Sequence, residues 1–330
     1  MRKHWAILTL NLLAALSFIA LVTTSRNRMR TTTLRLGHSL NTEHPVHVAM
    51  EALAREVHER SQGRLQIQLY PNSQLGSERE MIELTQLGAI DMVKTSTSPL
   101  EGFAPVMGVF SIPYVFRNEQ HFWNVIEGPI GQNLLLSTTN QLLRGLCYYD
   151  AGSRSFYSKT KPILAPADLQ GLKIRVQNSR TAIDMVKAMG GSPTPISFGE
   201  LYTALDQGVV DGAENNPPSF LTSRHYEVCQ HYTLDEHTRV PDILLIQTHA
   251  WNQLTPEHQQ LLQSAANNSA RFQRQLWKTK TAEALHTVQE AGVTIHTPDI
   301  TSFQQAAAPL HQAYQDSPVG PLIQHIQAAP

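Results

Sequence analysis

Arginine residues in two predicted strands give the first indication of what this chain recognises. Arg175 stands in residues 171–176 (GLKIRV), which we predict to form a buried strand. Arginine keeps its charge when it is buried and is rarely buried without a partner. Arg154 lies in a second short predicted strand, and its partner could be an acidic side chain of the facing lobe. If both arginines face one cleft, they form a clamp for an anion such as a ligand carboxylate.

Polar residues follow the predicted strand 209–213. Glu214 and Asn215 come directly after it, and in open α/β sheets ligands bind beyond the carboxyl ends of the strands. The Asn215 side chain offers a donor and an acceptor, which suits a ligand with hydroxyl groups, although it could also be a turn residue. Phe198 stands at the start of a predicted helix, where it could stack on a ligand or belong to the core.

The elements that would position these side chains occur in the same order twice. Residues 34–93 and residues 173–213 each give strand, helix, strand, capped helix and strand, and the last strand is residues 89–93 in the first unit and residues 209–213 in the second. This order predicts an α/β protein with two similar lobes. Thr255 and Pro256 then open a helical pattern without a strong breaker before Gly292, a length of about 50 Å at 1.5 Å per residue. We expect a helix of that length to cross both lobes.

Composition and motifs exclude several classes of function. The chain has 330 residues and a formal net charge of -1, so nucleic acid is not an expected partner. It has no P-loop, no G-x-G-x-x-G and no G-x-S-x-G, so we predict no cofactor and no catalytic nucleophile. His44 and His47 are too few to predict a metal site.

The amino terminus indicates where the protein works. Residues 1–4 are basic and residues 5–22 are mostly apolar, a pattern typical of a secretory signal. We interpret residues 1–26 as a signal peptide, cleaved or retained as an anchor, and expect the rest of the chain outside the cytoplasm. There, Cys147 and Cys229 could form one disulfide, or they could be two buried thiols.

Six segments in a fixed order point to a known family: residues 70–76 (YPNSQLG), 111–114 (SIPY), 168–176 (DLQGLKIRV), 191–195 (GSPTP), 198–205 (FGELYTAL) and 210–215 (VDGAEN). With them the chain resembles, from about residue 34 to residue 315, the DctP-type substrate-binding proteins of tripartite ATP-independent periplasmic (TRAP) transporters. The resemblance implies a two-lobed periplasmic-binding-protein-like fold with crossing hinge strands and a long helix spanning both lobes. Lobe I would comprise residues 32–150 plus about 240–275, and lobe II residues 151–239 plus about 280–325.

The resemblance also implies a function and a site. Such proteins close over a small organic acid in the periplasm and deliver it to a TRAP permease in the membrane. By the same match, Arg175 would form a salt bridge with the ligand carboxylate. Arg154, Asn215 and Phe198 would also contact the ligand, and Glu214 belongs to the same candidate site.

The ligand class follows from a difference within the family. Residues 94–99 (KTSTSP) lack the Glu and Arg that members binding sialic acid carry after this strand, so sialic acid is not expected. Residues 37–39, 44–47 and 75–80 are more similar to members that bind sugar acids such as uronates or aldonates. The candidates for contacts with ligand hydroxyls are then Lys94, His38 and Glu78.

Two alternatives remain open at this stage. A sensory binding protein would present its ligand to a receptor, and an uncleaved amino-terminal anchor would suit that role. A sugar-acid lyase would need a general base near the ligand, for which Glu78, Glu214 or a histidine is available. We expect neither, and we expect a monomer with Cys147 and Cys229 both near the hinge.

Overall fold

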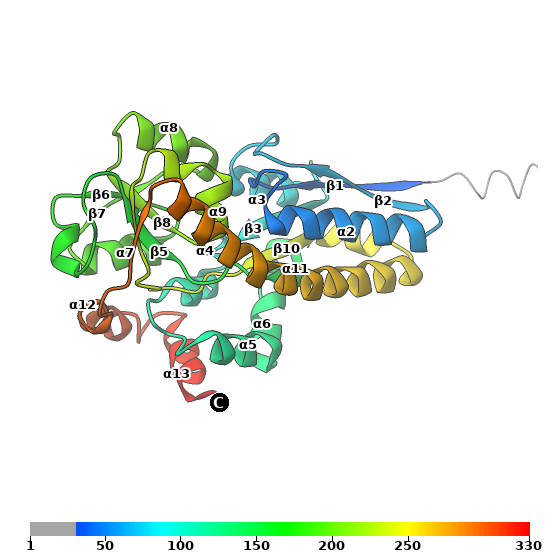
Figure 1. The fold of residues 1–330 in the computed structure, drawn as a ribbon. Coiled ribbons are helices and arrows are strands. Elements are labelled where there is room, and N and C mark those ends of the chain that lie inside the picture. The colour runs from blue at the N-terminus through cyan, green and yellow to red at the C-terminus, as the bar shows by residue number, and fades with distance from the viewer. Residues whose placement is uncertain (1–30) are drawn as a thin grey trace, which may run out of the picture.

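The computed structural model describes residues 31–330, so the predicted signal or anchor segment, residues 1–26, lies outside the described residues. Two separate sheets organise the rest (Figure 1). The first has the strand order β2-β1-β3-β10-β4. Its strands are β1 (Thr32–Gly37), β2 (Leu65–Tyr70), β3 (Met92–Ser96), β4 (Leu143–Tyr149) and β10 (Asp242–Gln247). We call this sheet, with the helices packed on it, lobe I.

The second sheet has the order β11-β9-β5-β8-β6-β7 and forms lobe II. Its strands are β5 (Ser155–Ser158), β6 (Lys173–Val176), β7 (Ser192–Pro195), β8 (Gly212–Asn215), β9 (His231–Thr233) and β11 (Thr294–His296). In each sheet three strands run parallel, β2, β1 and β3 in lobe I and β7, β6 and β8 in lobe II. The strands next to these, β10 and β5, run antiparallel to them.

Helices cover both sheets. In lobe I these are α2 (Pro45–Arg60), α3 (Glu78–Gln86), α4 (Thr97–Leu100), α5 (Glu119–Glu127), α6 (Pro129–Leu136) and α10 (Thr248–Gln253), with the 3-10 helix η1 (Pro105–Ser111). In lobe II they are α7 (Arg180–Ala188), α8 (Leu201–Asp206), α9 (Pro217–Thr222) and α12 (Thr301–Ala313), with η4 (Phe198–Glu200). The last helix, α13 (Gly320–Ala328), packs Ile323 and Ile326 into the lobe I core, together with Val319 just before the helix. The lobe boundaries given above stay predictions.

The same turn leads into the innermost parallel strand of each lobe. Gly88 and Gly208 both have positive φ, +74° and +70°, which glycine adopts without strain. After each glycine an aspartate side chain accepts the N–H of a neighbouring strand: Asp91 from Arg35 and Asp211 from Lys173, both at 2.8 Å. The two halves therefore share local chemistry as well as element order, as the sequence predicted.

Two crossing segments connect the lobes. The chain leaves lobe I after β4 and enters lobe II at β5, and it returns between β9 and β10. The segments meet where the Arg154 N–H donates to the Thr238 carbonyl oxygen at 2.8 Å. The predicted crossing strands are thus confirmed.

The long helix α11 (Pro256–Glu290) confirms the prediction of a helix that spans both lobes (Figure 1). Its Thr255 side chain caps the first turn by accepting the N–H of His258 at 3.2 Å. Leu262 and Ala266 pack in a lobe I core, and Val288 packs in a lobe II core. Within residues 31–330, no helix combines the length and apolar character needed to cross a bilayer.

The cysteines do not form a disulfide. Cys147 and Cys229 are both free and buried. Cys147 packs in a core of lobe I and Cys229 in a core of lobe II. The disulfide that the sequence left open is therefore absent, because the two thiols belong to separate cores and each acts as a small apolar side chain.

Candidate functional site

A cleft lies between the lobes, where the carboxyl ends of the parallel strands of both sheets meet. It consists of two adjoining pockets that share Glu78, Gln177 and Phe198. Lobe I and lobe II both contribute polar side chains to it. Lining residues include Ser39, Lys94, Ser96, Arg154, Arg175, Asn215, Asn216, Ser219 and Asp242. Six of the eight predicted ligand-binding residues are in the cleft wall; Glu214 and His38 lie behind it.

Arg175 is a positively charged side chain of this cleft that has no ion-pair partner among the described residues. It lies in β6 with only 1 % of its surface exposed. Its Nε donates to the Ile196 carbonyl oxygen at 2.8 Å, but its buried Nη1 has no hydrogen-bond partner. Among the described residues no carboxylate forms an ion pair with it. Burial lowers the pKa of Arg175, yet a guanidinium stays charged in proteins. The site therefore holds a buried positive charge that has no carboxylate of residues 31–330 in ion-pair contact.

Arg154 differs because its charge is already neutralised. Both Nε and Nη2 donate to the carboxylate of Glu214 on the neighbouring strand, and Nη2 also donates to the Glu214 carbonyl oxygen at 2.7 Å. Nη1 donates to Asn215 Oδ1 at 2.9 Å. The expected clamp of two free arginines is thus one free arginine, Arg175, beside one that is paired within its own lobe. The paired Arg154 holds the Asn215 amide in place.

The Glu214 carboxylate lies at the centre of a buried charge network. Burial alone would raise the pKa of Glu214, but the positive charges of Arg154 and His237 lower it to about 2. His237 Nε2 lies 3.5 Å from Glu214 Oε2, and His237 Nδ1 lies 2.7 Å from Asp235 Oδ2. Burial would lower the pKa of His237, but the two carboxylates raise it to about 9. The Glu214 carboxylate therefore stays charged and orients the Arg154 side chain from behind the cleft wall.

Lys94 forms the corresponding charge site in lobe I. Its Nζ lies 2.8 Å from Asp242 Oδ2 and 3.7 Å from Glu78 Oε1, and Lys94 is 1 % exposed. Glu78 Oε1 also accepts the N–H of Ser96 at 3.1 Å. An ammonium has three donors and a carboxylate has several acceptor sites. This cluster can therefore donate to and accept from hydroxyl groups in the cleft.

His38 belongs to a buried histidine chain instead of the cleft wall. The Leu40 N–H donates to His38 Nδ1 at 3.2 Å, which places the proton of the neutral ring on Nε2. That atom lies 3.0 Å from His47 Nδ1. Burial and the nearby Lys94 charge lower the pKa of His38 to about 2. The neutral ring thus supports the loop that carries Ser39 into the cleft.

The structure adds site residues that the sequence reasoning did not name. Gln177 stands directly after β6, and the rule on carboxyl ends of strands could have found it. Ser39 stands two residues after the end of β1, so the same rule could have found it. No sequence pattern pointed to Asp242, because Asp242 comes from the antiparallel return strand β10.

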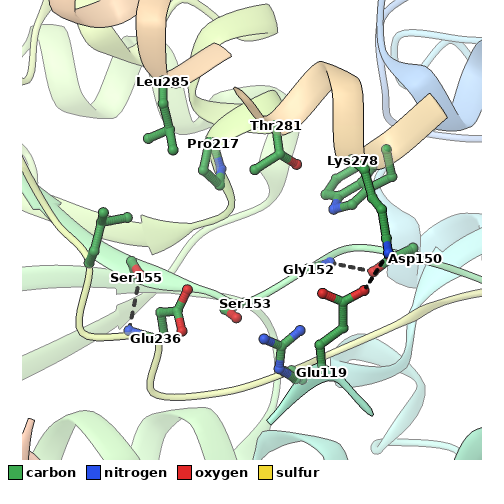
Figure 2. Close-up of a pocket in the computed structure, with 13 residues that line it drawn as sticks. Glu119, Asp150, Gly152, Ser153, Ser155, Pro217, Glu236, Lys278, Thr281 and Leu285 are labelled. Carbon is green, nitrogen blue, oxygen red and sulfur yellow. Dashed lines mark hydrogen bonds and ion pairs between the residues drawn. The ribbon is translucent and has the colours of Figure 1, made fainter. Parts of the chain in front are cut away.

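A separate pocket lies below α11, between the two crossing segments. It is lined by Asp150 and Ser153 of the first segment and by Glu236 and Arg239 of the second. Figure 2 shows Glu119 and Lys278 facing each other across it, with 3.6 Å between Glu119 Oε1 and Lys278 Nζ. None of the predicted site residues lines this pocket. Among residues 31–330 no three His, Cys, Asp or Glu side chains are grouped for a metal ion.

Comparison with known proteins agrees with this geometry. Residues 36–317 match the family model DctP, bacterial extracellular solute-binding protein, family 7. The 2,3-diketo-L-gulonate-binding periplasmic protein of Escherichia coli K12 is 31% identical over 86% of this chain and 86% of its own length.

Two solved structures extend the comparison. A TRAP periplasmic solute-binding protein from Xanthobacter autotrophicus Py2, with bound β-D-galacturonate, has 38% identity and a TM-score of 0.87 and covers 90% of this chain and 100% of its own. One from Polaromonas sp. JS666, bound to D-erythronate, has 34% identity and a TM-score of 0.88. It covers 90% of this chain and 99% of its own. This chain, with its two lobes and its arginine-bearing cleft, belongs to the DctP family of bacterial extracellular solute-binding proteins.

Proposed function

We propose that this protein captures a sugar acid, in first place a hexuronate, and delivers it to a TRAP permease. The observation that carries the proposal is Arg175, a buried guanidinium with one unpartnered nitrogen facing a small polar cleft. A buried cation without a counter-charge is costly, and a ligand carboxylate supplies that charge. The relatives with bound galacturonate and erythronate support the class of ligand.

The rest of the cleft suits hydroxyl groups. Asn215 uses its Oδ1 to accept from Arg154 and from the Asn216 N–H, which leaves its amide N–H₂ for the ligand. Lys94 and Glu78 add donors and acceptors on the opposite wall. Phe198 offers an aromatic face that can lie against a sugar ring.

Capture proceeds by closure of the lobes over the ligand. Contacts that join the lobes directly include Ser96 Oγ to Gln177 Oε1 at 3.4 Å and His44 Nε2 to Ser219 Oγ at 3.2 Å. The bound acid adds contacts to both lobes at once, so it shifts the population toward the closed state. In this proposal the protein works in the periplasm as a monomer; light scattering on the purified protein tests the monomer.

An enzymatic function receives no support from the cleft. A lyase needs a base near the ligand whose pKa is near the working pH, but Glu214 and His38 lie behind the cleft wall, and the pKa of each is lowered to about 2. The DctP family consists of binding proteins of transporters rather than enzymes.

A thermal-shift screen tests the proposal. The protein is unfolded, freed of co-purified ligand, refolded, and screened with uronates, aldonates, dicarboxylates and keto acids. A ligand stabilises the folded protein by a free energy of RT ln(1 + [L]/Kd) and so raises the melting temperature. Calorimetric titration then gives the affinity. Hits among uronates confirm the hexuronate, and hits confined to aldonates move the proposal to that class. Hits only among dicarboxylates, or none at all, contradict it.

A further inference from the structure

A second hollow lies on lobe I, away from the ligand cleft. It is a groove between α5, α6, β4 and the first half of α11, with a volume of about 570 Å³. Small-molecule pockets usually have about 300–1,000 Å³, so the groove can take a small organic molecule. Trp123, Leu135 and Leu146 give it an apolar wall. None of its lining residues also lines the cleft.

The charge of this groove is unbalanced. Arg144, Arg271 and Arg274 line it, whereas Glu127 is the one carboxylate in its wall. Glu127 Oε1 already pairs with Arg274 Nη1 at 2.9 Å. Within residues 31–330, Arg144 and Arg271 form no ion pair with a carboxylate. Two positive charges are therefore left over, and a hollow lined by charges of one sign concentrates ions of the other sign.

Aromatic rings lie against two of these arginines, Arg144 and Arg274. The Cζ of Arg144 lies 4.6 Å from the ring centroid of Trp251, and the Cζ of Arg274 lies 3.8 Å from that of Trp123. A cation–π contact holds the guanidinium by its flat face and leaves the N–H groups at its edge free to donate. Arg144 is thus an ordered guanidinium of the groove that has no carboxylate partner among residues 31–330, whereas Arg274 donates to Glu127 and Arg271 donates to the Asn268 side chain.

Two buried donor atoms of the groove residues have no partner. These atoms are Arg144 Nε and Trp123 Nε1, and Trp123 is only 5 % exposed. A buried donor without an acceptor costs about 1–3 kcal/mol, so such atoms are uncommon and call for an explanation. Both are donors, and both belong to side chains that line the same groove. Both atoms are covered in this structure, so an occupant with acceptor oxygens would satisfy them after a shift of the groove side chains.

We propose that this groove is a second binding site, for an amphiphilic organic anion. The acid group of the ligand binds Arg144 and Arg271, and its apolar body lies along Trp123 and Leu135. The inference is independent of the identity of the ligand in the cleft. It depends on the arginine excess and on the two unpartnered donors.

Two fluorescent probes with the same ring skeleton test the site. One is 8-anilinonaphthalene-1-sulfonate, an amphiphilic anion, and the other is N-phenyl-1-naphthylamine, which lacks the sulfonate. Each is titrated into the refolded protein and into Arg175→Ala, whose cleft has lost its free cation. We expect saturable binding of the sulfonate with the same affinity in both proteins, because the groove shares no residue with the cleft.

Groove variants give the decisive comparison. Arg271 is exposed, so Arg271→Gln should fold normally; Arg144→Gln and Trp123→Phe remove the two unpartnered donors. We expect Arg271→Gln with Arg144→Gln to weaken sulfonate binding at least about tenfold, Trp123→Phe to weaken it severalfold, and the uncharged probe to be unaffected. Arg224→Gln, whose side chain is 73% exposed in lobe II, is the matched control. Unchanged sulfonate binding in Arg271→Gln, equal losses for both probes, or loss of binding in Arg175→Ala would overturn the proposal.

Discussion

The Arg175 guanidinium lies over the ring of Phe198, with its Cζ 5.9 Å from the ring centroid. The two side chains form one corner of the cleft: the ring offers a face and the guanidinium offers an unpartnered Nη1. In the proposed function this corner separates ligand affinity from protein stability, because the charge of Arg175 is assigned to the ligand carboxylate and has no carboxylate partner among the described residues.

Arg175→Ala should therefore lose affinity without losing stability. We expect the affinity for the acid to fall at least about a hundredfold, equivalent to about 3 kcal/mol. The free energy of unfolding without ligand should stay the same or rise, because a buried unpaired charge is removed. Calorimetric titration and urea unfolding measure the two quantities.

Arg175→Lys tests the geometry of the same contact. An ammonium cannot reproduce the planar pair of donors that binds both oxygens of a carboxylate, so we expect at least a tenfold loss of affinity. Arg224→Ala, at an exposed position in lobe II, should bind normally. Near-normal affinity in Arg175→Lys would contradict a two-pronged contact.

Glu214→Gln should destabilise the protein, in contrast to Arg175→Ala. The substitution leaves Arg154, which is 4 % exposed, without its counter-charge, and loss of one partner of a buried pair typically costs about 3–5 kcal/mol. Urea unfolding without ligand measures this. The control is Glu83→Gln, which breaks the exposed pair with Arg79 and should cost about 1 kcal/mol or less. Equal effects of the two substitutions would refute the structural role of Glu214.

Stability should depend on pH through His237. Its pKa is raised to about 9, so its contribution is complete below the unfolded value of about 6.5 and is lost as the pH rises through about 9. Glu214, with a pKa lowered to about 2, contributes above about 4.5 and loses its contribution as the pH falls toward about 2. Together they predict a maximum between about pH 4.5 and 6.5 for this network.

His237→Gln isolates the alkaline part of that profile. The variant should show a smaller decrease of the free energy of unfolding between pH 6.5 and 9 than the unsubstituted protein shows. His286→Gln, at an exposed helical position, should leave the profile unchanged. Parallel profiles for the protein and His237→Gln would mean that His237 does not titrate in this range.

Glu101 should control how fast the ligand leaves. It follows α4 in lobe I, and its carboxylate accepts the Thr181 N–H at 3.2 Å and the Thr181 hydroxyl at 2.7 Å in lobe II. It thereby joins lobe I to the positive end of helix α7. We expect Glu101→Ala to speed ligand dissociation about tenfold, with association nearly unchanged, because only the closed state loses a contact.

Stopped-flow tryptophan fluorescence, with the acid found in the screen, measures both rates. The control is Glu290→Ala, at an exposed position near the end of α11. If Glu101→Ala altered association alone, or altered neither rate, the contact would not belong to closure.

The sequence predicted the elements of the two repeated units and the long helix, but it placed the last strand of each unit too early. It assigned residues 89–93 and 209–213 to strands, whereas β3 and β8 begin at Met92 and Gly212. The apolar residues before them belong to turns in which two successive N–H groups bind one helix carbonyl, that of Leu84 or of Ala204. Two apolar residues in such a turn have the same hydropathy as two residues at the start of a strand. The difference appears only in the structure, where the aspartate that follows accepts an N–H from a neighbouring strand.

For the site residues too, local sequence pattern could not show tertiary contacts. The position of Arg175 in a buried strand could be predicted from local pattern, and the structure places it there. The pairing of Arg154 with Glu214 could not be predicted, because it depends on the antiparallel register of β5 and β8 across about sixty residues of chain. His38 was proposed for the cleft from the resemblance of residues 37–39 to members that bind sugar acids, but its side chain points to His47.

The shifted strands bring out a symmetry between the lobes. Lys94 and Glu214 each stand three residues after the aspartate of the shared turn, so they occupy equivalent positions with opposite charges. Lys94 binds Asp242, where the second crossing segment enters β10, and Glu214 binds Arg154, where the first enters β5. Each crossing segment is thus fastened at the sheet that receives it. We therefore expect bending to fall on the few residues before each of these ion pairs, with the two lobes moving as rigid bodies, so that closure brings the same atoms of the two cleft walls together each time.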